Sequence, residues 1–69
     1  MSENEYTMEL LAAMVASDIA RRQKTSKVKA FMRFMKSQTA KMLFDESTCM
    51  WMNGPDYIAD EYRREKRKQ

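Results

Sequence analysis

The chain has no histidine, and it has one cysteine, one glycine and one proline among its 69 residues. A lone cysteine cannot close a disulfide within the chain, and a structural zinc site needs about four Cys or His ligands. Without histidine the commonest general base of enzymes is missing, and a single glycine excludes a glycine-rich phosphate loop. We therefore expect no enzymatic activity, no metal, no cofactor and no small-molecule substrate.

Long hydrophobic runs are absent as well. The apolar stretch Leu10–Ala16 is far shorter than the roughly 20 residues that a membrane-spanning helix needs. It also follows three glutamates, where a secretion signal would carry positive charge. One free cysteine and eight methionines suit a reducing compartment. The sequence therefore predicts a cytoplasmic protein with no membrane partner.

The length limits how much core the chain can build. A domain of this size buries only about 60% of the surface that its unfolded chain exposes, so its stability is marginal. Small chains compensate with disulfides, metals, very good packing or self-association. With the first two excluded, residues 1–69 should form a single small domain that depends on good packing or on a partner.

The hydrophobic pattern predicts an all-α fold, a small bundle of three to four helices. Apolar residues of the first helix recur at i, i+3, i+4 and i+7, as on one face of a helix. Thr25 or Ser26 can cap a second helix, and Ser37 either caps a third helix or lies inside a longer one. The predicted helices span about residues 4–23, 26–36, 38–46 and 55–66, and residues 63–69 form a frayed basic tail.

The second helix has a marked apolar stripe. Val28, Phe31 and Met35 share one face, while Phe34 falls off this stripe and is expected to contact a different neighbour. The sequence predicts a core made of Leu11, Met14, Val15, Ile19, Val28, Phe31, Met35, Leu43, Trp51, Ile58 and Tyr62. Cys49 is expected to be a small buried hydrophobe.

The methionines allow two readings. Met32, Met35 and Met42 have helical spacing and are expected to fill gaps in the core. Methionine is also flexible and polarizable, so a methionine-rich chain can form an adaptable binding face. The sequence leaves both readings open.

The stretch STCMWMNGPDYIADEY, residues 47–62, holds the only Trp, Cys, Gly and Pro of the chain. Asn53-Gly54 is a turn signal, with Gly54 supplying backbone freedom, and Pro55 suits the first turn of the last helix. One interpretation is a structural Trp/Gly/Pro corner at residues 47–55. The other is a recognition surface, in which exposed aromatic residues anchor a partner. The candidate partner-binding residues are Trp51, Tyr57, Tyr62 and Phe34.

Charge is banded along the chain. Residues 21–41 carry eight basic residues and no acidic one, whereas residues 1–20 and 42–60 each carry four acidic residues and no basic one. The basic band is either a solvated face or a site for an anionic partner such as nucleic acid. Its residues after Ser26 loosely resemble the second helix of a helix-turn-helix, although Arg33 alone could read guanine there. The candidate basic patch is Lys24, Lys27, Lys29, Arg33 and Lys36, with the tail from Arg63.

The segment FMRFMKSQTAKMLFDESTCMWMNGPDYIADEY, residues 31–62, resembles a family of short bacterial proteins of unknown function. The matching positions are Tyr57, Ile58, Asp60 and Tyr62; where many members carry Leu-His-Thr before Tyr-Ile, this chain carries CMWMNGP. Some members are encoded beside ADP-ribosyltransferase-like proteins in an arrangement that resembles a toxin–antitoxin pair. The resemblance implies a cytoplasmic accessory protein that binds another protein, and it implies no catalytic residue.

Two functions follow from these observations. The first is a non-enzymatic binding or regulatory module that acts on a protein partner, in an antitoxin-like role or as a homo-oligomer. The alternative is a small nucleic-acid-binding regulator that uses the basic band of residues 21–41. Salt separates them, because phosphate binding weakens steeply as salt rises and hydrophobic contact does not.

Overall fold

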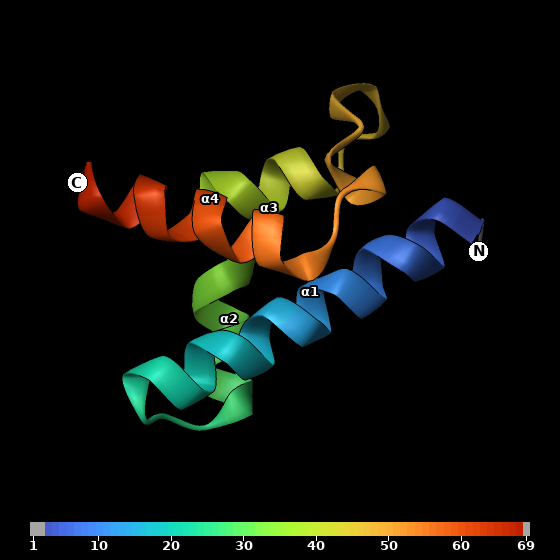
Figure 1. The fold of residues 1–69 in the computed structure, drawn as a ribbon. Coiled ribbons are helices and arrows are strands. Elements are labelled where there is room, and N and C mark those ends of the chain that lie inside the picture. The colour runs from blue at the N-terminus through green and yellow to red at the C-terminus, as the bar shows by residue number, and fades with distance from the viewer. Residues whose placement is uncertain (1–2, 69) are drawn as a thin grey trace.

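The computed structural model describes residues 3–68, which form a bundle of α-helices (Figure 1). The helices are α1 (Glu3–Gln23), α2 (Lys27–Met35), α3 (Gln38–Leu43) and α4 (Pro55–Arg67). Two single 3-10 turns, η1 (Glu46–Thr48) and η2 (Met50–Met52), connect α3 to α4. The described residues contain no strand, and the all-α bundle expected from the sequence is confirmed.

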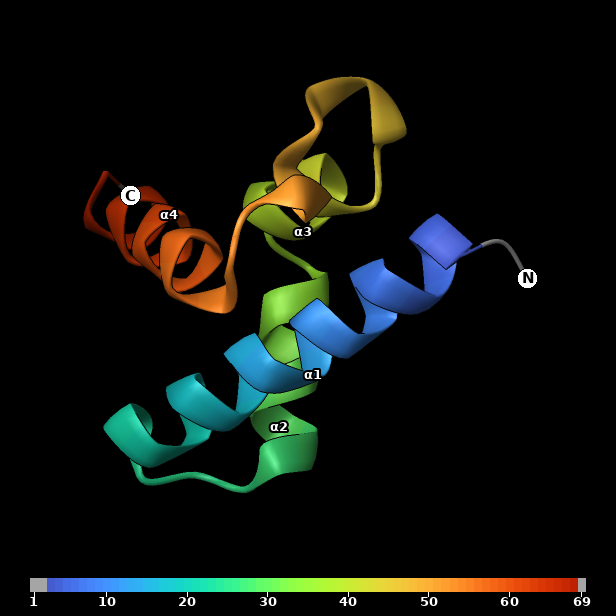
Figure 2. The ribbon, with the colours of Figure 1, turned by 45° about the vertical axis from the view of Figure 1, so that its right-hand side comes forward.

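The helices are arranged around α1. α1 packs against α2 and α4, and α3 packs against α4 and continues the chain from α2. Figure 2 shows α2 crossing behind α1, with α3 above it and α4 to one side. The η1–η2 segment projects from the end of the bundle near the start of α1, and the start of α1 lies on the opposite side of the molecule from the end of α4 (Figures 1 and 2).

Serine side chains set the starts of the two middle helices. Ser26 Oγ accepts a hydrogen bond from Lys29 N at 3.2 Å, and Ser37 Oγ accepts one from Ala40 N at 3.1 Å. Each serine thereby satisfies one backbone donor that the first turn of a helix leaves free. The second cap answers a question that the sequence left open, because α2 ends at Met35 and a new helix begins after Ser37.

The third helix is shorter than expected, ending at Leu43 and not near residue 46. Asp45 Oδ1 accepts hydrogen bonds from Ser47 N at 3.0 Å and Ser47 Oγ at 2.7 Å, and Thr48 Oγ1 donates to Met42 O at 2.5 Å. These side chains take backbone groups that a continuing helix would have paired. The bonds from Ser47, first of all the one from its side chain, also lower the pKa of Asp45.

The turn chemistry around Gly54 differs from the expectation. Gly54 caps α4 with φ −75°, a backbone angle that other residues adopt readily, so the freedom of glycine is not needed here. Pro55 takes the first helical position, as predicted. The left-handed conformation occurs at Lys24, with φ 53°, and at Cys49, with φ 56°. Cys49 is also exposed, not buried as expected, because it lies on the projecting segment between η1 and η2.

The core lies between α1, the inner face of α2, and helices α3 and α4. Of the predicted core, six residues are buried as expected: Leu11, Val15, Ile19, Leu43, Ile58 and Tyr62. Met14, Val28, Phe31 and Met35 are exposed, so their assignment to the core was wrong. The face of α2 that turns inward carries Ala30 and Phe34 in place of the predicted stripe.

Phe34 is the centre of this packing. Its side chain is 0% exposed, and its ring centroid lies 5.7 Å from that of Tyr62 at an interplanar angle of 57°. Lys66 Nζ lies 5.4 Å from the Tyr62 ring on the outer side. Ala30, one turn before Phe34, has no side chain beyond Cβ and so lets α2 approach α1 closely. Once Phe34 and Ala30 face inward, the neighbouring stripe of α2 must face solvent.

Glu65 of α4 fixes the start of α3. Its carboxylate accepts hydrogen bonds from Gln38 N at 2.9 Å, Thr39 N at 2.8 Å and Thr39 Oγ1 at 2.7 Å. Partial burial acts to raise the pKa of Glu65, but the hydrogen bonds from Thr39 and Gln38 prevail and leave it below its usual value. The negative charge also complements the positive end of the α3 dipole.

Phe34→Ala should lower the free energy of unfolding by about 3–5 kcal/mol, because it opens a cavity at the centre of the core. Phe31→Ala is the matched control: the Phe31 side chain is 39% exposed, so it should cost about 1 kcal/mol. Urea denaturation followed by circular dichroism measures both. Equal losses for the two variants would contradict this assignment of the inner face of α2.

Glu65→Gln should lower the free energy of unfolding by about 1–2 kcal/mol near neutral pH, because it weakens charge-assisted hydrogen bonds to α3. The pKa of Glu65 is lowered in the folded protein, so its contribution is complete above the unfolded-state value of 4.5 and is lost as pH falls through the folded-state value. Denaturation at a series of acidic pH values should show a shallower loss of stability in the variant. Parallel curves of equal height would refute this role.

Candidate functional site

Helix α1 is apolar on its outer face as well as its inner one. From Leu10 to Ser17 it carries no charged residue. Leu11 and Val15 point into the core, while Leu10 and Met14 are exposed, Met14 by 48%. A helix that is apolar all round is normally covered on all sides. The outer face of α1 is therefore an apolar surface that this chain leaves open to solvent.

A second apolar stripe lies beside it on α2. Val28 is 69% exposed, and Phe31, Met32 and Met35 on the same face are exposed too. This is the stripe that the sequence analysis assigned to the core. It lies outside because Phe34 and Ala30, on the adjoining face of the same helix, fill the space against α1 and α4.

A groove of about 450 Å³ runs between the two stripes. Its walls are mostly apolar, and we call it the α1–α2 groove. The residues that line it are Ala13, Ala16, Ser17, Lys27, Val28, Phe31 and Met32. The α1 wall is made of small residues, which would let another backbone approach closely.

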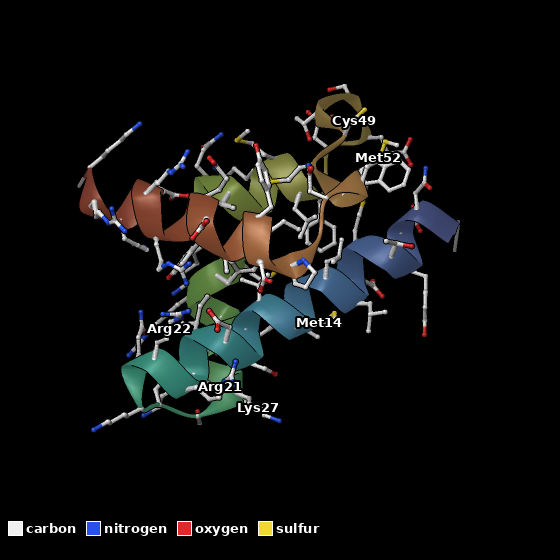
Figure 3. All side chains as sticks on the ribbon, in the orientation of Figure 1. Met14, Arg21, Arg22, Lys27, Cys49 and Met52 are labelled. Carbon is white, nitrogen blue, oxygen red and sulfur yellow. The ribbon has the colours of Figure 1, made fainter. Side chains whose placement is uncertain are left out.

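Basic residues surround one end of the groove. Lys27 lines it directly, and Arg21 lies at the same end of the molecule (Figure 3). Lys24, Lys29, Arg33 and Lys36 of the predicted basic patch are all exposed. Arg33 donates a hydrogen bond to Gln23 Oε1 at 2.7 Å, which ties α2 to the last turn of α1. The predicted patch thus lies on two sides of α2 and includes one residue of the groove.

The opposite end of α1 is acidic. A second hollow, of about 410 Å³, is lined by Glu5, Met8, Glu9, Phe44 and Glu46. Asn4 Nδ2 donates to Glu46 Oε1 at 3.5 Å and so links the start of α1 to η1. Charge bands that are separate in sequence therefore become an acidic end and a basic end of one molecule.

The remaining acidic residue of α1 is neutralised within the fold. Asp18 pairs with Arg21 at 3.3 Å, with Arg22 at 2.9 Å and with Arg63 of α4 at 3.5 Å. Three arginines therefore balance the charge of the one carboxylate that α1 carries near its basic end. The polarity of the helix, acidic at its start and basic at its end, is preserved at the surface.

The aromatic candidates divide between core and surface. Phe34 and Tyr62 are buried, so neither is accessible to a partner in this conformation. Burial, with a contribution from Glu65 that outweighs an opposing one from Arg33, raises the pKa of Tyr62. Trp51 is half-buried and packs against the core, with Nε1 buried and without a hydrogen-bond acceptor among the described residues. Tyr57 alone of the four is largely exposed.

Residues 47–62 therefore have features of both interpretations, the structural corner and the exposed recognition surface. Trp51 anchors η2 to the bundle, as a structural corner requires, while Tyr57 projects on α4. The more extensive open apolar surface lies elsewhere, on α1 and α2. The residues predicted to bind a partner do not include this surface, although the charge-free run Leu10–Ser17, with apolar residues on both faces, is a signal for it.

The described residues show neither a metal-binding cluster nor a membrane-spanning helix. No cluster of three or more Cys, Asp and Glu side chains within residues 3–68 is arranged to hold a metal ion. Of the helices described, none is both long and apolar enough to cross a bilayer.

Comparison with protein-family models, with curated proteins and with solved structures finds no match. The resemblance of residues 31–62 to short bacterial accessory proteins therefore remains an expectation.

Trp51→Ala should lower the free energy of unfolding by about 2–3 kcal/mol, because the ring packs against the core and is half-buried. Tyr57→Ala, which removes an aromatic residue that is 49% exposed, should leave stability within about 0.5 kcal/mol of the parent. Thermal and urea denaturation compare the two. Unchanged stability in the Trp51 variant would show that this ring is not part of the structural corner.

Proposed function

We propose that the protein is a non-enzymatic, cytoplasmic binding module that takes a helical segment of a protein partner into the α1–α2 groove. The observation that carries this proposal is the continuous apolar surface formed by the outer stripes of α1 and α2, with the groove between them. Contiguous exposed apolar surface on a soluble protein is typical of a site that binds another molecule.

The shape and composition of the surface favour a helix as the bound element. An amphipathic helix binds by laying its apolar face into a hydrophobic groove, with contacts every third or fourth residue. Met32 lines the groove, and Met14 lies on the exposed outer stripe of α1 next to the groove residue Ala13. Their flexible, polarizable side chains can adapt to the shape of what binds there. Lys27 on the wall adds an attraction for acidic groups.

An accessory role toward another protein also agrees with what the sequence resemblance implies. An antitoxin-like protein neutralises its partner by occupying a surface, for which an apolar groove with a charged edge is sufficient. No catalytic group is needed, because affinity comes from burying apolar surface and orientation comes from charge.

A second candidate function is binding of nucleic acid. The observation that favours it is the exposed basic face of α2, where Lys29, Arg33 and Lys36 project with no acidic residue on the same helix. Contacts of this kind are to phosphate and carry little sequence information. The acidic end of α1 would have to lie away from the nucleic acid.

Capture of a partner by tagged protein tests the proposal, with nuclease present and at two salt concentrations. Met32→Glu, which places a charge on the groove, should reduce recovery at least about tenfold. Met52→Glu is the matched control: it makes the same change at a residue 69% exposed on the η2 turn, away from the groove, and should leave recovery unchanged. Equal recovery by both variants would refute use of the groove.

The alternative has its own measurement. Fluorescence anisotropy with labelled duplex DNA and RNA should detect binding that falls steeply between about 50 mM and about 200 mM salt. The double variant Lys29→Glu, Arg33→Glu should abolish that binding and leave protein capture by the groove intact. Full nucleic-acid binding by the double variant would exclude the basic face of α2.

A further inference from the structure

The charge distribution along α1 identifies what fits against the outer surface. The first nine residues of the chain include three acidic residues and no basic one, and the middle of α1 is uncharged. After Ser17, the single acid Asp18 is balanced by Arg21, Arg22 and Arg63. Lys24 and Lys27 follow at the same end. A helix with this polarity is complementary to a second copy of itself that runs in the opposite direction.

We propose that the partner in the groove is a second copy of this chain, with α1 of each protomer lying antiparallel in the α1–α2 groove of the other. The proposal rests on the proposed function, since it uses the same groove and names its occupant. The contact is symmetric about a two-fold axis, so both protomers bury the same surface. The charge-free middle of α1 lies at the axis, where burial is most complete.

The register follows from the positions of the charges. With the axis at Ala13, residues whose numbers add to 26 lie side by side, so the partner's Glu9 lies level with Ser17. Ser17 lines the groove together with Lys27, which brings the partner's Glu9 to Lys27. The same arrangement brings the partner's Glu5 to Arg21. Among the described residues, neither Glu9 nor Lys27 makes an ion pair in the single chain.

The alternative arrangements are less favourable. A parallel pair of α1 helices would place acid beside acid and base beside base, which is destabilising. An anionic membrane would attract Lys27 but repel Glu9, which lies toward the acidic end of α1. Self-association also meets the need of a chain whose size leaves it marginally stable.

A stable dimer would bury a substantial share of the surface of this chain. Stable interfaces bury about 800 Å² on each partner, which is about a sixth of the 4909 Å² exposed by this chain. The outer stripes of α1 and α2 lie on both sides of the groove and supply large exposed hydrophobic side chains. They are Leu10, Met14, Val28, Phe31, Met32 and Met35.

Sedimentation and native mass spectrometry of the purified full chain over a range of concentrations provide the test. The parent should be a dimer, and Met14→Glu should weaken dimerisation at least about tenfold, because it places two charges near the two-fold axis. Met52→Glu should dimerise as the parent does. Circular dichroism shows that each variant is folded, and Met14 and Met52 are both exposed, so neither change disturbs the core.

A charge exchange tests the register. Glu9→Lys alone and Lys27→Glu alone should each be monomeric, because each homodimer would hold two like-charged pairs. Mixed together, the two variants should form a heterodimer, in which both pairs are of opposite charge. Dimers of either variant alone that are as stable as the parent, or no heterodimer on mixing, would overturn the antiparallel register.

Failure of this inference can be distinguished from failure of the proposed function. A parent that stays monomeric at all concentrations, while Met32→Glu abolishes capture of a different protein, overturns the second copy as occupant and leaves the groove as a binding site. A monomeric parent whose captured proteins are unaffected by Met32→Glu overturns both.

Discussion

Burial of Phe34 is the constraint on which the rest of the arrangement depends. Its ring fills the space between α1 and α4 and packs against Tyr62. Because Phe34 is buried there, the Ala30 side of α2 faces α1. A helix of nine residues can present only one face to the core, so the stripe containing Val28 and Met32 is left outside. The groove is a consequence of this packing, because it lies where the outward stripe of α2 meets the outer face of α1.

Polar side chains make the short helices possible. Helices of six and nine residues are not stable alone, and each begins with four backbone donors that lack helical partners. Ser26 and Ser37 satisfy one donor each, and Glu65 satisfies two more at the start of α3 from a distant part of the chain. Glu65 therefore does more than cap a helix, because it joins α4 to the middle of the chain.

The fold gathers the charge bands of the sequence at opposite ends of one surface helix. Residues near Glu9 and Glu46 are far apart along the chain but line one hollow at the start of α1. The basic residues at the end of α1 and the start of α2 gather at the other end because the turn at Lys24 folds α2 back against α1. An apolar surface between two ends of opposite charge provides both affinity and direction to whatever binds it.

Features of the fold that depend on residues close together in the sequence could be predicted, whereas those that depend on contacts between helices could not. The sequence alone was enough to predict the helical class, the start of α4 at Pro55 and most of the inner face of α1, and to name Ser26 and Ser37 as possible caps, because these depend on contacts within a few residues. Packing between helices settles which of the two adjoining apolar faces of α2 is buried, and therefore that Val28 and Phe31 are exposed. Hydrophobic periodicity shows only how apolar each face of a helix is. It therefore predicted burial of the wider apolar stripe of α2, which is the exposed one. The face of α2 that carries Phe34 is buried because its ring fits the space between Tyr62 and α1.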